Sequence, residues 1–404
     1  MNNKKIKILA ITLDQDGVGY YRMNSPYLAL NDPDIDVKLL TSNDFTFKFD
    51  EETLKDFNII VYHKALPFRT QEEIQNFPNI VNKYNIKIVF EIDDHWVLNP
   101  THINYSQWKN GKSQETTINQ IKHSHYVCTT TTHFADEVRK LNPNVVVFEN
   151  AVNHKEQQWI PNKVESEKTR FIWGGGITHN PDLLLMKDSF KMIDKKFLKD
   201  NQIYMCGYDL RVRTKNGVFV DDSGRNMWSN FENIFTNNGR YITNFKHDTW
   251  LKTRVDNGRL NYGYNEEFKD EFYQRRWTKP IFTYGTMYNE ADIALAPLKS
   301  GMIFNKVKSQ LKVIEAGIHK CPVIASNYGP YTLDVIDGKH GFLIDESDRA
   351  GWYNKMKWFS ENPSAIVDMG ESLNELVLEK YTLDKINQKR IEFFKFIYSL
   401  KENP

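Results

Sequence analysis

The sequence predicts an α/β protein with two domains, each a doubly wound parallel sheet covered by helices on both faces. A chain of 404 residues exceeds what one small core usually holds. Short apolar runs alternate with connections of helix length, which is the pattern of parallel sheets buried on both faces. The alternation restarts after a polar stretch at residues 153–169, so we expect this architecture to occur twice.

The first half contains six candidate strands, all rich in β-branched residues. They are KIKILAIT, DVKLLTS, FNIIVYH, IKIVFEID, HYVCTTT and NVVVFEN. Each is followed by a longer polar or amphipathic stretch, as the crossovers of a parallel sheet require. We therefore expect a Rossmann-like N-terminal domain over residues 1–160.

The second half repeats the pattern after NHKEQQWIPNKVESEKT, whose charge, proline and lack of periodicity indicate a linker. Five candidate strands follow: RFIWGGG, QIYMCG, ADIALAPL, CPVIAS and GFLID. These predict a second Rossmann-like domain over residues 161–381. The stretch TLDKINQKRIEFFKFIYSL, with Thr382 as N-cap, predicts a C-terminal helix over 382–404 that packs back on the N-terminal domain.

Residues 208–276 break the alternation, and we expect an irregular insertion in the second domain there. Between Cys206 and Pro280 the chain has 13 lysines and arginines against 10 aspartates and glutamates, a charge of +3, with 14 aromatic residues. Either the segment is an elaborated surface hairpin, or it binds an acceptor.

Composition excludes several classes of function. Lys+Arg 53 against Asp+Glu 52 leaves a net charge of +1, so the whole chain has no polyanion-binding character. Its three cysteines lack CxxC spacing, which argues against disulfides and zinc. The opening MNNKKIKILAITL predicts a strand rather than a signal peptide, and no run approaches the ~20 apolar residues of a membrane span. We expect a cytoplasmic protein, with peripheral membrane contact left open.

Because parallel sheets bind ligands beyond the carboxyl ends of their strands, the loops there are the candidate sites. In LDQDGVGYYRMNSPYLAL, Gly17 and Gly19 allow a close backbone approach, and Arg22 suits an anionic or sugar ligand. The alternative is a plain tight turn. In FEIDDHW, Asp94 and His95 have groups that can orient hydroxyls or move a proton, although capping or a metal-binding aspartate pair would leave the same pattern.

Two loops of the second half suit a phosphate. In FIWGGGITHNPDLLLM, Gly175 and Gly176 precede a predicted helix and expose amide groups, and His179 adds a hydrogen-bonding group. A strand-to-helix turn that requires small residues is the alternative.

FNKVKSQLKVIEAGIHKCPVIAS predicts a helix that starts near Asn305. It would place Lys308, Lys312 and Glu315 within roughly 40° of one another, beside an apolar stripe. Ser309 lies in the first turn, where backbone donors and the two lysines would meet a diphosphate, while Glu315 would accept bonds from ribose hydroxyls. A solvated helix face needs no ligand. The apolar stripe consists of Val307, Leu311, Ile314 and Ile318.

The strings GGGITHNPD, YNEADIALAPL, KSQLKVIEAGIHKCPVIASNYGPY and DGKHGFLID resemble the GT-B glycosyltransferases of the large retaining group that uses nucleotide-diphosphate sugars. The resemblance covers nearly the whole chain outside roughly 208–276. More narrowly, GVGYYRMNSPY, EIDDHW and RRWTKPIFTYGTMYNEADIALAPL are similar to members encoded by tailed phages, which implies the host cytoplasm as location.

The resemblance implies a cleft between the two domains and a UDP- or GDP-linked sugar as co-substrate, with no permanent cofactor and no metal. Glu315 matches the second glutamate of the family's ribose-binding motif, whereas Val307 stands at the first. The family's usual Arg and Lys after the first strand of the second domain are missing, so Lys308 and Lys312 are expected to neutralise the diphosphate. Trp277 occupies the strand end where related enzymes hold the base.

The leading hypothesis is therefore a glycosyltransferase acting with retention on a saccharide, lipid-linked or protein acceptor. Its catalytic residues would be Asp94, His95, Lys308 and Lys312. One alternative is a viral enzyme that glycosylates a hydroxymethylated pyrimidine of DNA. Another is a nucleotide-sugar-binding protein without catalysis, and a GT-B epimerase is a minor rival.

Overall fold

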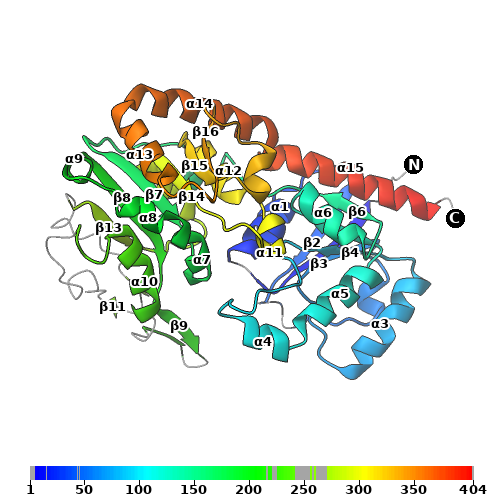
Figure 1. Ribbon diagram of the computed structural model, residues 1–404. Coiled ribbons are helices and arrows are strands. Elements are labelled where there is room, and N and C mark those ends of the chain that lie inside the picture. The colour runs from blue at the N-terminus through cyan, green and yellow to red at the C-terminus, as the bar shows by residue number, and fades with distance from the viewer. Residues whose placement is uncertain are drawn as a thin grey trace. The chain divides into compact units, whose positions relative to one another are not determined.

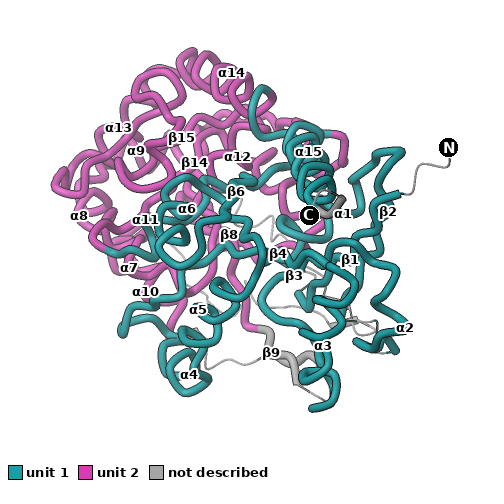
Figure 2. The backbone as a smooth tube through the Cα atoms, turned by 90° about the vertical axis from the view of Figure 1, so that its right-hand side faces the viewer, with its two compact units in different colours: residues 1–154, 302–311, 379–404 teal, residues 155–301, 312–378 magenta. Residues whose placement is uncertain are grey.

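The computed structural model describes residues 5–14, 16–42, 44, 46–214, 217–220, 225–241, 255–256, 259–260 and 271–402 (Figure 1). The chain divides into two compact units, shown in teal and magenta in Figure 2. The first unit comprises Met1–His154, Met302–Leu311 and Glu379–Pro404, and the second comprises Lys155–Gly301 and Lys312–Leu378. The chain thus returns to the first unit twice.

The first unit contains a six-stranded parallel sheet in the order β2-β1-β3-β4-β5-β6, and all six predicted strands are confirmed. Their bounds are β1 Ile6–Thr12, β2 Ile35–Leu40, β3 Ile59–His63, β4 Lys87–Glu91, β5 Tyr126–Thr129 and β6 Val145–Val147. The strand order reverses between β1 and β3. The carboxyl ends of these two strands therefore form the crevice where doubly wound sheets bind ligands.

Helices cover both faces of this sheet. Successive side chains of a strand point to opposite faces, and because both sets are apolar here, both faces must be covered. Leu9 and Ile11 of β1 belong to one core cluster, whereas Ile8 and Ala10 belong to another that also contains Phe394 of α15. The helices of the unit are α1 Ser25–Leu28, α2 Glu51–Leu54, α3 Gln71–Lys83, α4 Tyr105–Asn110, α5 Ser113–His123, α6 Thr132–Arg139, α11 Ile303–Lys306 and α15 Leu383–Glu402, with a π-helical turn at Tyr20–Asn24.

The second unit contains a parallel sheet in the order β13-β8-β7-β14-β15-β16. Numbered within the unit, this is the 3-2-1-4-5-6 order of dinucleotide-binding folds, with its crevice between β7 and β14. The strands are β7 Thr169–Gly174, β8 Asn201–Tyr208, β13 Tyr273–Trp277, β14 Ile293–Ala296, β15 Val323–Ser326 and β16 Gly341–Ile344. Five of them were predicted, and β13 was not.

The helices of the second unit also pack on both faces of its sheet. Phe171 and Trp173 of β7 lie in one core cluster, and Ile172 lies in the other. The helices are α7 Asn180–Leu183, α8 Lys187–Phe190, α9 Lys195–Asp200, α10 Arg225–Phe235, α12 Leu311–Ile318, α13 Gly351–Glu361 and α14 Pro363–Lys380, with 3₁₀ turns at Gln157–Trp159, Ile177–His179, Leu184–Met186, Tyr284–Glu290 and Gly329–Leu333.

The expected insertion at 208–276 is narrower than the sequence suggested, although much of it lies outside the described residues. Two short antiparallel pairs stand apart from the six-stranded sheet: β9 Arg211–Thr214 with β10 Gly217–Val220, and β11 Val255–Asp256 with β12 Arg259–Leu260. Strand β13, by contrast, joins the six-stranded sheet beside β8, and helix α10 packs in the same core cluster as β13. They were missed because a buried ion pair, Arg275 Nη2 to Glu232 Oε2 at 2.6 Å, interrupts their apolar patterns. Among the residues that the structure describes, we find no helix with the length and apolar content needed to cross a bilayer.

Candidate functional site

The glycine loop follows β7 in the crevice of the second unit. A Cβ on Gly175 would lie 2.8 Å from the Trp173 ring, and a Cβ on Gly207 would lie 2.2 Å from the Gly175 carbonyl oxygen. Gly207 also has a φ of +107°, so both positions require glycine. A Cβ on Gly176, in contrast, would meet nothing within 4 Å. The backbone is therefore open to a ligand at Gly176.

His179 is fixed beside this loop by hydrogen bonds. Its Nδ1 lies 2.8 Å from Asp182 Oδ2, and Asp182 Oδ1 accepts a bond of 2.8 Å from the Lys299 amide that follows β14. Asp182 is only 3% exposed, so the pair ties the glycine loop to the next strand of the crevice. His179 is thus held in place with an imidazole that is partly exposed.

Helix α12 brings Lys312 and Glu315 to the same crevice. The Lys312 ammonium group donates to the Gly174 carbonyl oxygen and lies 6.0 Å from the Trp173 ring centroid. Glu315, one turn further, is 3% exposed, and its Oε2 accepts a hydrogen bond of 3.1 Å from the Tyr288 hydroxyl. Burial, with a smaller effect of the Glu315 charge, raises the pKa of Tyr288 well above its usual value, so the phenol remains a donor.

The expectation of one continuous helix that carries Lys308, Lys312 and Glu315 is wrong. Helix α11 ends at Lys306 and α12 begins at Leu311, and Lys308 belongs to the first unit. Partners distant in sequence hold the residues between the two helices: Thr131 donates to the Val307 carbonyl, Asn150 donates to Ser309 Oγ at 2.9 Å, and Gln310 bonds Tyr381. These tertiary contacts override the helical pattern.

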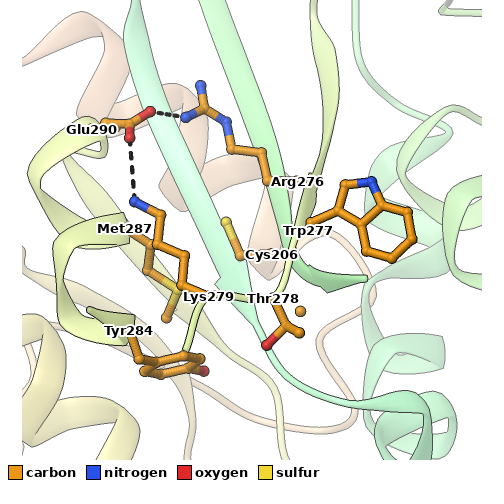
Figure 3. A pocket seen from close by; sticks show the side chains of 9 residues that line it. Cys206, Arg276, Trp277, Thr278, Lys279, Tyr284, Met287 and Glu290 are labelled. Atoms are coloured by element: carbon orange, nitrogen blue, oxygen red, sulfur yellow. Dashed lines mark ion pairs between the residues drawn. The ribbon is translucent and has the colours of Figure 1, made fainter. Parts of the chain in front are cut away.

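A pocket lies beyond the carboxyl ends of β8 and β13 (Figure 3). Cys206, Lys279 and Tyr284 line it, and Arg276 and Lys279 form ion pairs with Glu290. It encloses only about 10 Å³, which is room for a single water. Figure 3 shows the Trp277 ring turned away from the side on which Tyr284 lies. The Trp277 ring packs edge-on against Tyr208, with centroids 5.1 Å apart.

The loop after β1 is shaped by its two glycines. Gly17 has a φ of +48°, and a Cβ on Gly19 would lie 1.8 Å from the Asp14 carbonyl oxygen. Arg22 is fully buried, where its Nη2 lies 2.5 Å from Glu91 Oε2 and its Nη1 donates to the Phe148 carbonyl. Arg22 therefore binds its own chain, and the turn is one that only glycine fits.

Two aspartates follow β4 at the edge of the first crevice. Asp93 Oδ1 lies 3.1 Å from His63 Nε2. Burial opposes the ionisation of Asp93, but the hydrogen bond and charge interaction with His63 outweigh it and hold the pKa of Asp93 below its usual value. Asp94 is exposed, although the chain around its carboxyl group displaces part of the water that would otherwise surround it. The loss of solvent there, followed by the charge of Asp93, raises the pKa of Asp94 to about 7.

His95 points into the core rather than toward these aspartates. Its ring stacks on Trp96 with centroids 4.2 Å apart, lies 6.1 Å from Phe134, and is 3% exposed. Its Nδ1 accepts a bond from the Val97 amide, and burial lowers the pKa of His95, so the ring is neutral at pH 7. The structure thus separates His95 from Asp94, with which the sequence analysis grouped it.

The segment that precedes α12 completes this edge of the first unit. Lys308 lies 5.3 Å from the Phe304 ring centroid, and its charge acts on Asp94. Asn305 is 3% exposed, and Ser309 accepts its bond from Asn150. Lys308 thus meets the acidic edge of the first unit, whereas Lys312 meets the glycine loop of the second.

Sequence reasoning missed three residues at these two crevices. His63 is the last residue of β3, Lys64 follows it, and Tyr288 lies in the 3₁₀ turn Tyr284–Glu290. Lys64 has a φ of +66°, and its Nζ lies 2.7 Å from Asp14 Oδ2. The string FNIIVYH ends on His63, so inspection of every strand end, rather than of glycine loops alone, would have found it.

Two doubly wound sheets with these strand orders, each with a polar, glycine-containing crevice, are consistent with the GT-B fold. Residues 267–362 match the family described as "Glycosyl transferases group 1". No curated protein matches the sequence.

Among solved structures, sucrose-phosphate synthase of Thermosynechococcus elongatus is similar with a TM-score of 0.64 at 11% identity, over 98% of this chain and 100% of that one. HepE of Anabaena in complex with UDP-glucose gives 0.60 at 10% identity, over 96% and 99%. An α-glucosyltransferase in complex with UDP and a 13-mer DNA containing an HMU base gives 0.59 at 12%, over 97% and 100%. The predicted GT-B fold is confirmed, and the family match supports a glycosyltransferase.

Proposed function

We propose that the protein transfers a sugar from a nucleotide-diphosphate sugar to an acceptor hydroxyl, with retention and without a metal. The observation that carries this proposal is the crevice of the second unit, where Lys312 of α12 bonds the Gly174 carbonyl and Glu315 lies one turn further along the same helix. In that crevice a cation and open backbone lie beside a buried carboxylate that can accept hydrogen bonds. A diphosphate followed by a ribose requires these groups in this order.

The diphosphate is bound by Lys312 and by the amides of Gly175 and Gly176, with further charge from Lys308. As the glycosidic bond breaks, negative charge develops on the departing nucleoside diphosphate, so fixed cations stabilise the transition state more than the ground state. Without ligand, the Lys312 ammonium is satisfied by the Gly174 carbonyl, and a phosphate oxygen would replace that acceptor. His179 donates to the same phosphate or to the sugar.

Glu315 accepts hydrogen bonds from the ribose hydroxyls, and the base occupies the pocket beyond β8 and β13. That pocket is small, so a base enters only when Lys279 moves aside. Trp277 stacks on the base once it has turned from Tyr208. Because two of the similar structures, HepE and the α-glucosyltransferase, contain UDP-glucose or UDP, UDP-linked sugars are the first donors to test, with GDP-linked sugars next.

The acceptor hydroxyl is oriented by Asp94 in the first unit, and its proton leaves to a phosphate oxygen of the donor. Asp94 suits this task because it is exposed and its pKa is about 7. A carboxyl group with a pKa near neutral pH accepts a hydrogen bond or a proton more readily than an ordinary aspartate does. The Gly17 and Gly19 turn forms the adjoining wall. Arg22 and His95 do not touch the acceptor, because both are buried.

The test is a panel of UDP- and GDP-linked sugars, screened for thermal stabilisation and then for release of nucleoside diphosphate. A donor at 100 times its dissociation constant adds about 2.7 kcal/mol to the free energy of unfolding. Stabilisation with release supports a transferase, whereas stabilisation without release by any acceptor supports the non-catalytic binding protein. If no nucleotide or nucleotide sugar stabilises the protein, the proposal is wrong.

A DNA-modifying transferase is the second candidate, because one similar structure contains DNA with a modified base and because the segment between Cys206 and Pro280 is basic and aromatic. Such an enzyme would flip the hydroxymethylated pyrimidine out of the duplex and hold the strand by phosphate contacts and stacking. Transfer of sugar to hydroxymethylated DNA, with retention on DNA that falls steeply with salt, supports this version. Transfer to saccharides alone rules it out.

A further inference from the structure

His63 lies at the edge of the first crevice and has no role in the function proposed above. It is the last residue of β3 and pairs with Glu91, the last residue of β4. Asp93 lies two residues after Glu91 in the sequence. The side chain is 2% exposed, and its Nε2 lies 3.1 Å from Asp93 Oδ1. Because a carboxylate only accepts hydrogen bonds, Nε2 carries the proton and donates to Asp93.

This bond is the polar contact that fixes the His63 ring. Among the residues that the structure describes, His63 Nδ1 is buried and has no hydrogen-bond partner. Other buried histidines that the structure describes, His95 and His319, also have a ring nitrogen without a hydrogen-bond partner, so it is the bond to Asp93 that distinguishes His63. The protein thus tolerates an unsatisfied nitrogen at this position while keeping the bond to Asp93.

Asp93 and Asp94 differ in whether their carboxyl groups have a partner within the protein. Lys64 is paired with Asp14, and Arg22 is paired with Glu91, while Asp93 is bonded to His63. Within the described part of the chain, Asp94 has no hydrogen bond or ion pair, although the charges of Lys308, Lys64 and His63 act on it. Asp94 is therefore the carboxyl group at this edge that is left for a ligand.

We propose that His63 is a positioning residue of the acceptor site, which holds the Asp93 carboxylate as a fixed negative charge so that the neighbouring Asp94 binds the acceptor hydroxyl. This inference rests on the proposed function, because that function supplies the hydroxyl. His63 acts through Asp93 and does not touch the acceptor. The consequence is a chain of three side chains, in which only the last one meets the ligand.

Steady-state sugar transfer, measured from pH 5 to 9, tests whether His63 acts through Asp93 on Asp94. His63→Leu removes the donor to Asp93 and should lower kcat/KM at pH 8 about tenfold, the order that a hydrogen bond to a charged group contributes. His63→Gln keeps an N–H donor and should restore kcat/KM to within about threefold of the wild type. His123→Leu, at an exposed histidine of α5, is the matched control and should change nothing.

Asp93→Asn provides a second readout that a merely structural role would not move. The wild type should gain kcat/KM as the pH rises through about 7, where Asp94 ionises. Removing the charge of Asp93 should move this acid limb to lower pH by roughly one unit. If the limb stays in place, or if His63→Leu equals the wild type, the inference is overturned.

Thermal unfolding without substrate separates this inference from the proposed function. A carboxyl group whose pKa is higher in the folded than in the unfolded state destabilises the fold increasingly as the pH rises from about 4 to about 7. Asp94→Asn should therefore raise Tm more at pH 8 than at pH 5. When Asp93 is already replaced by asparagine, the gain in Tm at pH 8 should be smaller, because part of the destabilisation comes from the charge of Asp93. If the wild type transfers no sugar, the proposed function is wrong, but the coupling between Asp93 and Asp94 can still be measured from Tm. If Asp94→Asn raises Tm equally with and without Asp93→Asn, the inference is overturned.

Discussion

Replacing Lys312 by methionine tests the donor site most directly. The substitution keeps the apolar stem beside Trp173 and removes the ammonium group that now bonds the Gly174 carbonyl. Two unit charges 4 Å apart interact by about 4 kcal/mol near a protein surface. Part of this energy is present already in the ground state, because the diphosphate is charged throughout. Only the share that grows as the leaving group departs affects kcat, and by analogy with oxyanion-hole donors we expect kcat to fall about 100-fold.

The assay is release of nucleoside diphosphate under saturating donor, with dissociation constants for the nucleotide measured by calorimetry. Lys320→Met is the matched control, since Lys320 follows the same helix but is paired with Glu371 at the surface. Its kcat should equal that of the wild type. If Lys312→Met folds, with Tm close to that of the wild type, and turns over within threefold of it, then the counter-charge lies elsewhere and the donor site must be reassigned.

Three further predictions concern single groups. Glu315→Gln should weaken nucleotide binding about tenfold by calorimetry, because a charged acceptor of ribose hydroxyls becomes neutral, and unchanged affinity would assign the ribose contact to another residue. Asp94→Asn should abolish the rise of kcat/KM through pH 7, because the ionised carboxylate is the form that orients the hydroxyl; a variant with the same acid limb would refute this role. Arg22→Met should lower the free energy of unfolding in urea by about 3 to 5 kcal/mol, because it leaves Glu91 charged and buried, and a second change, Glu91→Leu, should recover most of that loss.

The sequence predicted the strands well because their patterns are simple. Runs such as IKIVFEID are apolar at nearly every position, as a sheet buried on both faces requires. Strand β13, YQRRW, failed that test because Arg275 finds its partner Glu232 in α10, 43 residues away in the sequence. No local pattern reveals a buried charge whose partner is so distant.

The part of the candidate site that depends on local spacing was predicted, and the part that depends on partners distant in sequence was not. Lys312 and Glu315 are three residues apart on one helix, so their spacing alone places them together. Lys308 departs from that helix because Asn150 and Thr131, far away in the sequence, bind the backbone and side chains around it. His95 points into the core rather than toward Asp94 because residues after a strand end turn according to their own backbone angles, which the alternation of side chains does not determine.

The order in which the chain is synthesised has a consequence for the first unit. Ile386, Phe394 and Ile397 of the last helix are fully buried in the same cluster as Ile8 and Ala10 of the first strand. Proteins fold from the N-terminus as they leave the ribosome, yet one layer of this core emerges only when α15 is made, after the strands of both sheets. During synthesis β1 therefore keeps an uncovered apolar face until a helix that is encoded much later becomes available.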